Sequence, residues 1–125
     1  MVDIKESVLD RDTHQTPSLS PAVFHILLAL GDGELHGYGI MQEIERFTEG
    51  KLHVGPGTLY RSIKQMLADG LIEESDERPD PVLDDERRRY YRLTQLGIRT
   101  VQAEMNRLSQ LVAVAHRKRL LAGGG

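Results

Sequence analysis

The stretch GPGTLYRSIKQMLADGLI, residues 55–72, decides the fold of this chain. Its apolar residues recur at the i, i+4, i+7 and i+8 positions that share one helix face, namely Leu59, Ile63, Met66 and Leu67. Pro56 suits the first turn of a helix, and Asp69-Gly70 is a typical helix end. The stretch therefore predicts an amphipathic helix over residues 55–69.

The other face of this helix is polar and free of negative charge, because residues 50–68 contain no acidic residue. It carries Thr58, Tyr60, Arg61, Ser62, Lys64 and Gln65. Arginine pairs bidentately with guanine and glutamine with adenine, while lysine and tyrosine suit phosphate oxygens. The free N–H groups and the positive dipole end of the helix N-terminus attract anions. An isolated face of this kind is more often a solvated surface, but its place in the chain favours a recognition helix in the major groove of DNA.

Two helices are predicted before this one. Ser20-Pro21 supplies the N-cap and the first residue of a mostly buried helix. The motif HGYG, residues 36–39, precedes a second, amphipathic helix that ends at Glu49-Gly50. A helix, a short turn and a further helix are the helix-turn-helix arrangement.

Two short strands are predicted after it, at residues 71–74 and 87–93, with an acidic, proline-containing loop between them. They form a hairpin, the wing, over about residues 71–93. Strand alternation places Tyr91 and Leu93 on the core, and it places Arg88, Tyr90 and Arg92 on the opposite face.

The basic run at the start of the second strand has two interpretations. We expect Arg87, Arg88 and Arg89 to reach phosphates or the minor groove of DNA. The alternative is that these arginines pair with the preceding acids and only hold the hairpin together. Those acids are Asp84, Asp85 and Glu86.

A last helix is predicted over residues 94–120, with Thr94 as its N-cap. Apolar residues three and four positions apart form a stripe along it: Ile98, Val101, Met105, Leu108, Val112 and Ala115. Such a stripe can pack on its own domain or on a partner. A helix of about 40 Å, at ~1.5 Å per residue, is longer than three short helices can cover, so we expect its free part to pair with a second subunit.

Together these elements predict a mainly α fold with a small β-hairpin. A winged helix-turn-helix domain over residues 19–93 is followed by a long C-terminal dimerisation helix over 94–120. Residues 1–18 form an N-terminal arm or tail, and residues 121–125 form a flexible tail. A two-fold dimer sets two recognition helices one duplex turn apart, ~34 Å, which suits a palindromic operator.

Four motifs in this order resemble those of the PadR-like transcriptional regulators: HGYGI at 36–40, GTLY at 57–60, LADGLI at 67–72 and YRLT at 91–94. The resemblance covers about residues 19–120. It implies a winged-helix repressor that dimerises through its C-terminal helix and is often released by a small molecule. It also implies that Tyr38 lies near the DNA backbone, and that Thr58 and Tyr60 begin the recognition helix.

Two features depart from the family. Arg61 stands where the family often has proline, although an arginine there suits DNA. The single C-terminal helix replaces the larger helical domain of longer members, so a ligand-sensing mechanism that depends on that domain does not transfer.

Composition limits the alternatives. The chain of 125 residues has no cysteine, which excludes disulfides and thiolate metal sites and favours a reducing cytoplasm. Its net charge is -3, but the acidic residues concentrate in residues 73–86 and the chain is basic from Arg87 onward. A local basic face can bind double-stranded DNA despite an acidic total. No apolar stretch approaches the ~20 residues of a membrane span, so we expect a cytoplasmic protein without membrane partners.

Rival functions are less well supported. Four of the five histidines are candidates for a catalytic or metal-binding role: His25, His36, His53 and His116. None has a partner at catalytic or metal-ligand spacing, so we expect no enzyme, no metal and no cofactor. His25 is interpreted as a core or interface residue and His36 as a turn residue. The main alternative is a dimeric winged-helix protein-interaction module that does not bind DNA, which the acidic balance favours. Because tryptophan is absent, a stacking platform for a planar effector is disfavoured.

Overall fold

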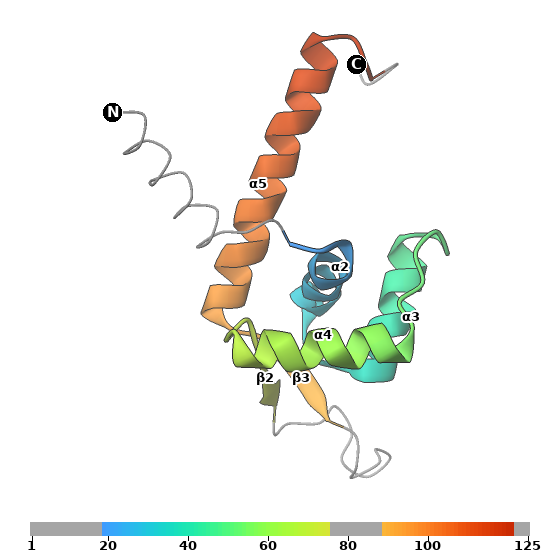
Figure 1. The fold of residues 1–125 in the computed structure, drawn as a ribbon, viewed down its shortest axis with the longest axis vertical. Helices are drawn as coiled ribbons and strands as arrows, with labels where there is room; N and C mark the ends of the chain where they lie inside the picture. The colour runs from blue at the N-terminus through green and yellow to red at the C-terminus, as the bar shows by residue number, and fades with distance from the viewer. Residues whose placement is uncertain (1–18, 76–88, 122–125) are drawn as a thin grey trace, which may run out of the picture.

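A computed structural model describes residues 19–75 and 89–121 of the chain. Within these ranges it has four α-helices, one 3₁₀ turn and three short strands (Figure 1). The helical elements are α2 (Pro21–Ala29), η1 (Leu30–Asp32), α3 (Gly37–Phe47), α4 (Pro56–Ala68) and α5 (Gln95–Arg117). The predicted N-terminal arm, Arg87, Arg88 and the acidic loop lie outside the described residues.

Side chains at the preceding residue begin three of the helices. Ser20, His36 and Thr94 precede α2, α3 and α5, and each accepts a hydrogen bond from the backbone N–H three residues on, at 3.0 to 3.2 Å. Such a bond satisfies a donor that the first turn leaves free. The predicted caps at Ser20 and Thr94 are confirmed. His36, interpreted as a turn residue, is instead the cap of α3.

Glycines end the two helices of the helix-turn-helix, as the sequence predicted. Gly50 follows α3 with φ 77° and Gly70 follows α4 with φ 76°, a left-handed conformation that glycine adopts without strain. After α4, the N–H of Leu71 donates to the carbonyl of Met66 at 2.9 Å, which closes the last turn. The chain leaves α4 in a fixed direction, toward the strands.

The core lies where α2 meets the other helices. In Figure 1, α2 lies between α3 and α5, and α4 crosses beneath it. The most deeply buried side chains come from α2, α3, α4 and the strand that follows: Ile26, Leu27, Ile40, Ile44, Leu59, Met66 and Ile72. Burial of one such side chain contributes about 1.5 to 3 kcal/mol, so this shared core fixes α4 relative to the other helices.

The sheet has three strands, whereas the sequence predicted a two-stranded wing. A short strand β1 (Leu35–His36) pairs antiparallel with β3 (Tyr90–Leu93), which also pairs with β2 (Ile72–Ser75). The order is therefore β1-β3-β2. The prediction failed because β1 has only two residues and pairs with a strand far along the chain, so no local alternation marks it.

This third strand also corrects the orientation assigned to Tyr90. Alternation predicted that Tyr90 faces outward, but only 7% of it is exposed. His36 lies opposite Tyr90 in the β1–β3 register, and the two rings meet edge to face at 5.2 Å. Tyr91 is buried on the core as predicted, so neighbouring residues of β3 are buried on both faces of the sheet.

The long helix α5 leaves the body and extends away from α4 (Figure 1). Val101, on its second turn, is 6% exposed and belongs to the domain's own core. The sequence placed Val101 in the dimer stripe, and the structure shows that this residue packs within its own domain, where α2 contacts α5. Neither α5 nor any shorter helix of the described ranges is long and apolar enough to cross a membrane.

Candidate nucleic-acid interface

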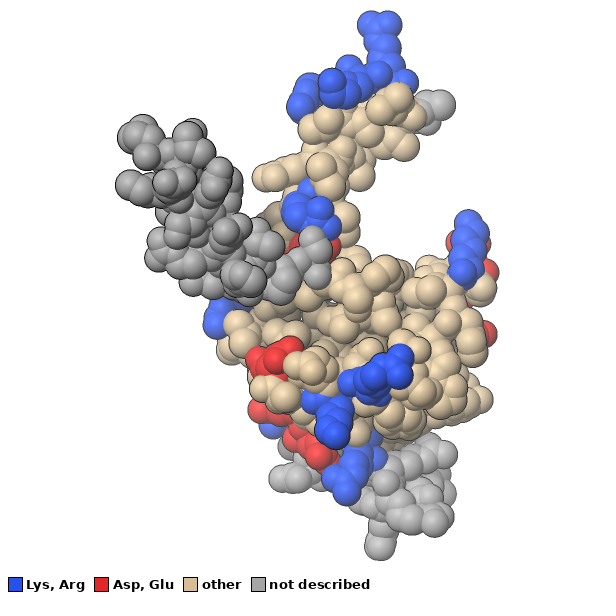
Figure 2. Space-filling model, in the orientation of Figure 1, with Lys and Arg blue, Asp and Glu red and all other residues tan. Residues whose placement is uncertain are grey.

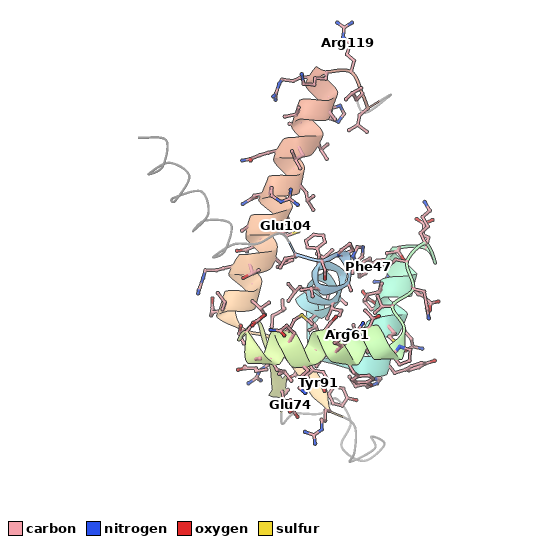
Figure 3. The ribbon with its side chains drawn as sticks, viewed as in Figure 1. Phe47, Arg61, Glu74, Tyr91, Glu104 and Arg119 are labelled. Atoms are coloured by element: carbon pink, nitrogen blue, oxygen red, sulfur yellow. The ribbon has the colours of Figure 1, made fainter. Side chains whose placement is uncertain are left out.

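The helix α4 presents one polar face to solvent. Leu59, Ile63 and Met66 are buried, whereas the residues proposed from the sequence to face DNA are exposed: Thr58, Tyr60, Arg61, Lys64 and Gln65. Figure 2 shows Lys and Arg side chains over α4 and over the strands below it, with acidic side chains gathered beside them. Arg61 points outward from α4 in Figure 3. The arrangement leaves hydrogen-bond donors of α4 accessible to a large anionic partner.

The two exposed tyrosines belong to different helices of the helix-turn-helix. Tyr38 in the first turn of α3 is 59% exposed, and Tyr60, the fifth residue of α4, is 51% exposed. A Cβ at Gly37 would collide with the Tyr60 hydroxyl and ring, so glycine is what allows this ring to lie against α3. Tyr60 therefore packs on the start of α3 while half of its surface remains available.

Hydrogen-bonding groups at the two ends of α4 affect how this helix binds a partner. Gly55 precedes the helix and supplies no side-chain cap, unlike the residues that begin the other three α-helices described. The first N–H groups of α4 and its positive dipole end therefore lack a side-chain acceptor. At the other end, Gln65 Nε2 donates to Asp69 Oδ1 at 3.0 Å, which engages one of the two N–H donors of this amide.

The wing arginines that the structure describes are paired across the hairpin. Arg89 Nη1 donates to Glu74 Oε1 at 3.0 Å, and Arg92 Nε donates to Glu73 Oε2 at 2.7 Å. The acids proposed from the sequence as alternative partners lie outside the described residues. Sequence reasoning missed Glu73 and Glu74, although the β2–β3 register, once known, brings both to the arginine strand.

Tyr91 connects the wing to α4. It lies opposite Glu74 in the register, and Figure 3 places both beneath α4. Burial raises the pKa of Tyr91, Glu74 and Tyr60 raise it further, and the Arg89 guanidinium opposes them. These four side chains therefore interact on the side of the hairpin that faces α4.

Of the remaining histidines that the structure describes, two contact neighbouring side chains and one is exposed. His53 Nδ1 lies 2.9 Å from Glu45 Oε2, and the ring of His25 stacks on Phe47 with 6.0 Å between centroids. His116 lies exposed near the end of α5. Within the described residues, no three His, Asp or Glu side chains gather as metal ligands would.

The predicted dimer stripe is divided along α5. Ile98 and Met105 are partly exposed and line an open groove of about 630 Å³ beside α2 and η1. Farther along, Leu108 and Ala115 are half-buried and Val112 is 48% exposed. The stripe apart from Val101 thus offers apolar surface that the described part of this chain leaves uncovered.

The comparisons with known proteins agree with this architecture. The model of the transcriptional regulator PadR-like family matches residues 26–103. This chain belongs to the PadR-like family. A similar relative is the transcriptional regulator Rv3488 of Mycobacterium tuberculosis, 37% identical over 87 residues that make up 70% of this chain and 75% of that protein.

Two solved structures illustrate the shared PadR-like fold. A transcriptional regulator from Clostridium thermocellum superposes with a TM-score of 0.64 at 24% identity, over 77% of this chain and 87% of that one. Bacillus subtilis PadR in complex with operator DNA superposes with a TM-score of 0.56 at 20% identity, over 66% of this chain and 45% of that one. The family and these relatives are described as transcriptional regulators and not as enzymes.

Proposed function

We propose that this PadR-like chain is a homodimeric repressor that binds a palindromic operator in double-stranded DNA. The observation that carries the proposal is the face of α4, which is exposed, cationic, free of acids along its length and fixed by the core. The same fold in Bacillus subtilis PadR was solved with operator DNA. An α-helix held in this way fits the major groove.

The proposed contacts divide into two kinds. Arg61 and Gln65 read base edges, while Tyr38, Thr58, Tyr60 and Lys64 position the protein on phosphates. Arg87, Arg88 and Arg89 of the wing supply further contacts to phosphates or the minor groove. The uncapped N–H groups at the start of α4 add donors to a phosphate oxygen.

Dimerisation is proposed to use the outer part of α5. Exposed apolar residues on a helix that extends beyond its domain are buried when a second subunit packs there. A two-fold pair then presents two copies of α4 about one duplex turn apart, ~34 Å. An operator covered by such a dimer is closed to polymerase, which is the basis for proposing repression.

An effector is proposed to bind the groove between α2 and α5. The residues that line the groove include the apolar Leu27, Leu28, Ile98 and Met105 and the acidic Asp32 and Glu34. An apolar cleft of a few hundred Å³ with few polar groups is typical of small-molecule sites. A ligand there contacts both the winged domain and α5, so it can alter the distance between the two copies of α4.

Selection of genomic fragments by the purified protein, followed by sequencing, tests the proposal. We expect a palindromic consensus and a gel shift at submicromolar protein that weakens steeply with salt, since phosphate contacts release counterions. The absence of salt-dependent retardation at micromolar protein contradicts DNA binding and favours the protein-interaction module. A consensus without two-fold symmetry contradicts the dimer.

A further inference from the structure

The hairpin carries two arginine–carboxylate pairs that differ in where they lie. Arg89 pairs with Glu74 at 3.0 Å on the face that holds Tyr91, which interacts with Tyr60 of α4. On the other face, Arg92 Nε lies 2.7 Å from Glu73 Oε2, and Arg92 Nη1 lies 3.6 Å from Glu34 Oε2. The Arg89 pair therefore lies beside the proposed recognition surface, and the Arg92 pair faces away from it.

Glu74 lies beside a cation that phosphates would approach. Its carboxylate is on the same face of the hairpin as Tyr91 and pairs there with Arg89. The side chains of Arg89 and Glu74 are 69% and 44% exposed, so water and salt screen their attraction and the pair separates readily. A phosphate that takes Arg89 must still approach a carboxylate that is left behind.

We propose that Glu74 limits the affinity of the wing for phosphates: it neutralises Arg89 in the free protein and so weakens binding to every duplex, whatever its base sequence. The inference rests on the proposed DNA-binding function. Non-specific binding depends almost entirely on phosphate contacts, so one cancelled cation lowers it strongly. Operator binding also has base contacts from α4, but the loss of one phosphate contact lowers both affinities by the same factor and leaves their ratio unchanged.

The test compares Glu74→Gln with Glu73→Gln, which removes the same charge one residue away on the opposite face. Binding of the selected operator and of a shuffled duplex is measured across salt concentrations. We expect Glu74→Gln to raise affinity for both duplexes roughly fivefold and to steepen both log–log salt slopes by about 0.9, with the operator-to-shuffled ratio unchanged. Glu73→Gln should leave both affinities and both slopes unchanged.

A second background isolates the role of Arg89. In Arg89→Gln protein, Glu74→Gln should have no further effect on the salt slope, because the cation that it releases is absent. The same change in both backgrounds, or weaker binding by Glu74→Gln, overturns the proposal. Wild-type protein that binds neither duplex overturns the proposed function and this inference with it. Normal operator binding with an unchanged Glu74→Gln variant overturns only the inference.

Discussion

Arg61 lies exposed on the second turn of α4, one residue after the tyrosine that packs on α3. If it pairs with a guanine, Arg61→Ala should cost roughly 1 to 3 kcal/mol of operator binding and leave binding to shuffled DNA nearly unchanged. Competition gel shifts with both duplexes measure this difference. Arg99→Ala, which removes an exposed arginine from α5, is the matched control. An equal loss on both duplexes means that Arg61 contacts phosphate instead.

The raised pKa of Tyr91 predicts how the free energy of unfolding changes at alkaline pH. Burial first, and then Glu74 and Tyr60, raise its pKa above the ordinary 10.0. Above pH 10 the unfolded chain therefore loses this proton while the folded protein keeps it, so the free energy of unfolding falls as pH rises. The slope from this one group approaches about 1.4 kcal/mol per pH unit.

Urea unfolding at several pH values between about 8 and 11 measures this slope. Tyr91→Phe keeps the buried ring and removes the titrating hydroxyl, so its stability should fall less steeply than that of the wild type. Parallel curves for the two proteins would show that Tyr91 titrates alike when folded and unfolded.

At the scale of elements, the junction of α4, β2 and α5 depends on one close approach. A Cβ at Gly97 would collide with the carbonyl oxygen of Leu71, a backbone atom that cannot move aside cheaply. Gly97→Ala should therefore destabilise the protein by about 1 to 3 kcal/mol, as overpacked cores do. The control is Gly57 in the first turn of α4, where an added Cβ would meet open space. Gly57→Ala should be neutral or slightly stabilising. Equal denaturation midpoints for the two variants would contradict the role given to Gly97.

Helix boundaries could be predicted from the sequence because their causes are local. Ser20, Thr94 and Gly70 act on backbone groups a few residues away, so the starts of α2 and α5 and the end of α4 are readable from neighbouring residues. The last helix, predicted to reach residue 120, ends at Arg117. The exposed and buried faces of α4 follow from helical spacing in the same way. Contact of that exposed face with DNA stays a prediction.

Pairings between distant segments could not be predicted in this way. The strand Leu35–His36 exists because β3 lies beside it, more than fifty residues along the chain. The burial of Tyr90 depends on that pairing, and the partner of Arg89 depends on the register of β2 with β3; neither follows from local alternation. Helical spacing likewise could not show that α2 covers Val101 and leaves the outer part of the same stripe free.

At the scale of the whole molecule, two parts of the apolar stripe on α5 have different roles. Its inner residue Val101 belongs to the core of the domain, whereas its outer residues are proposed to pair two subunits. Val101→Asp places a carboxylate in the domain's own core and should unfold the monomer, so it does not test dimerisation. Val112 is 48% exposed on the outer part of the stripe. Val112→Glu should therefore leave the helical circular dichroism of the chain intact, because this exposed side chain takes no part in the domain's own core.

In a two-fold dimer, Val112→Glu buries two carboxylates of like charge at the interface, one from each subunit. The cost of several kcal/mol should raise the dimer dissociation constant roughly 100-fold or more. Light scattering should then change from twice 14.1 kDa for the wild type toward 14.1 kDa for the variant. Gln110→Glu adds the same charge on the opposite, exposed face of α5 and should leave the mass unchanged.

Because each α4 alone makes only half of the operator contacts, Val112→Glu should also weaken operator binding, although no residue of α4 has changed. A dimeric Val112→Glu protein with wild-type operator affinity would mean that the subunits pair through another surface.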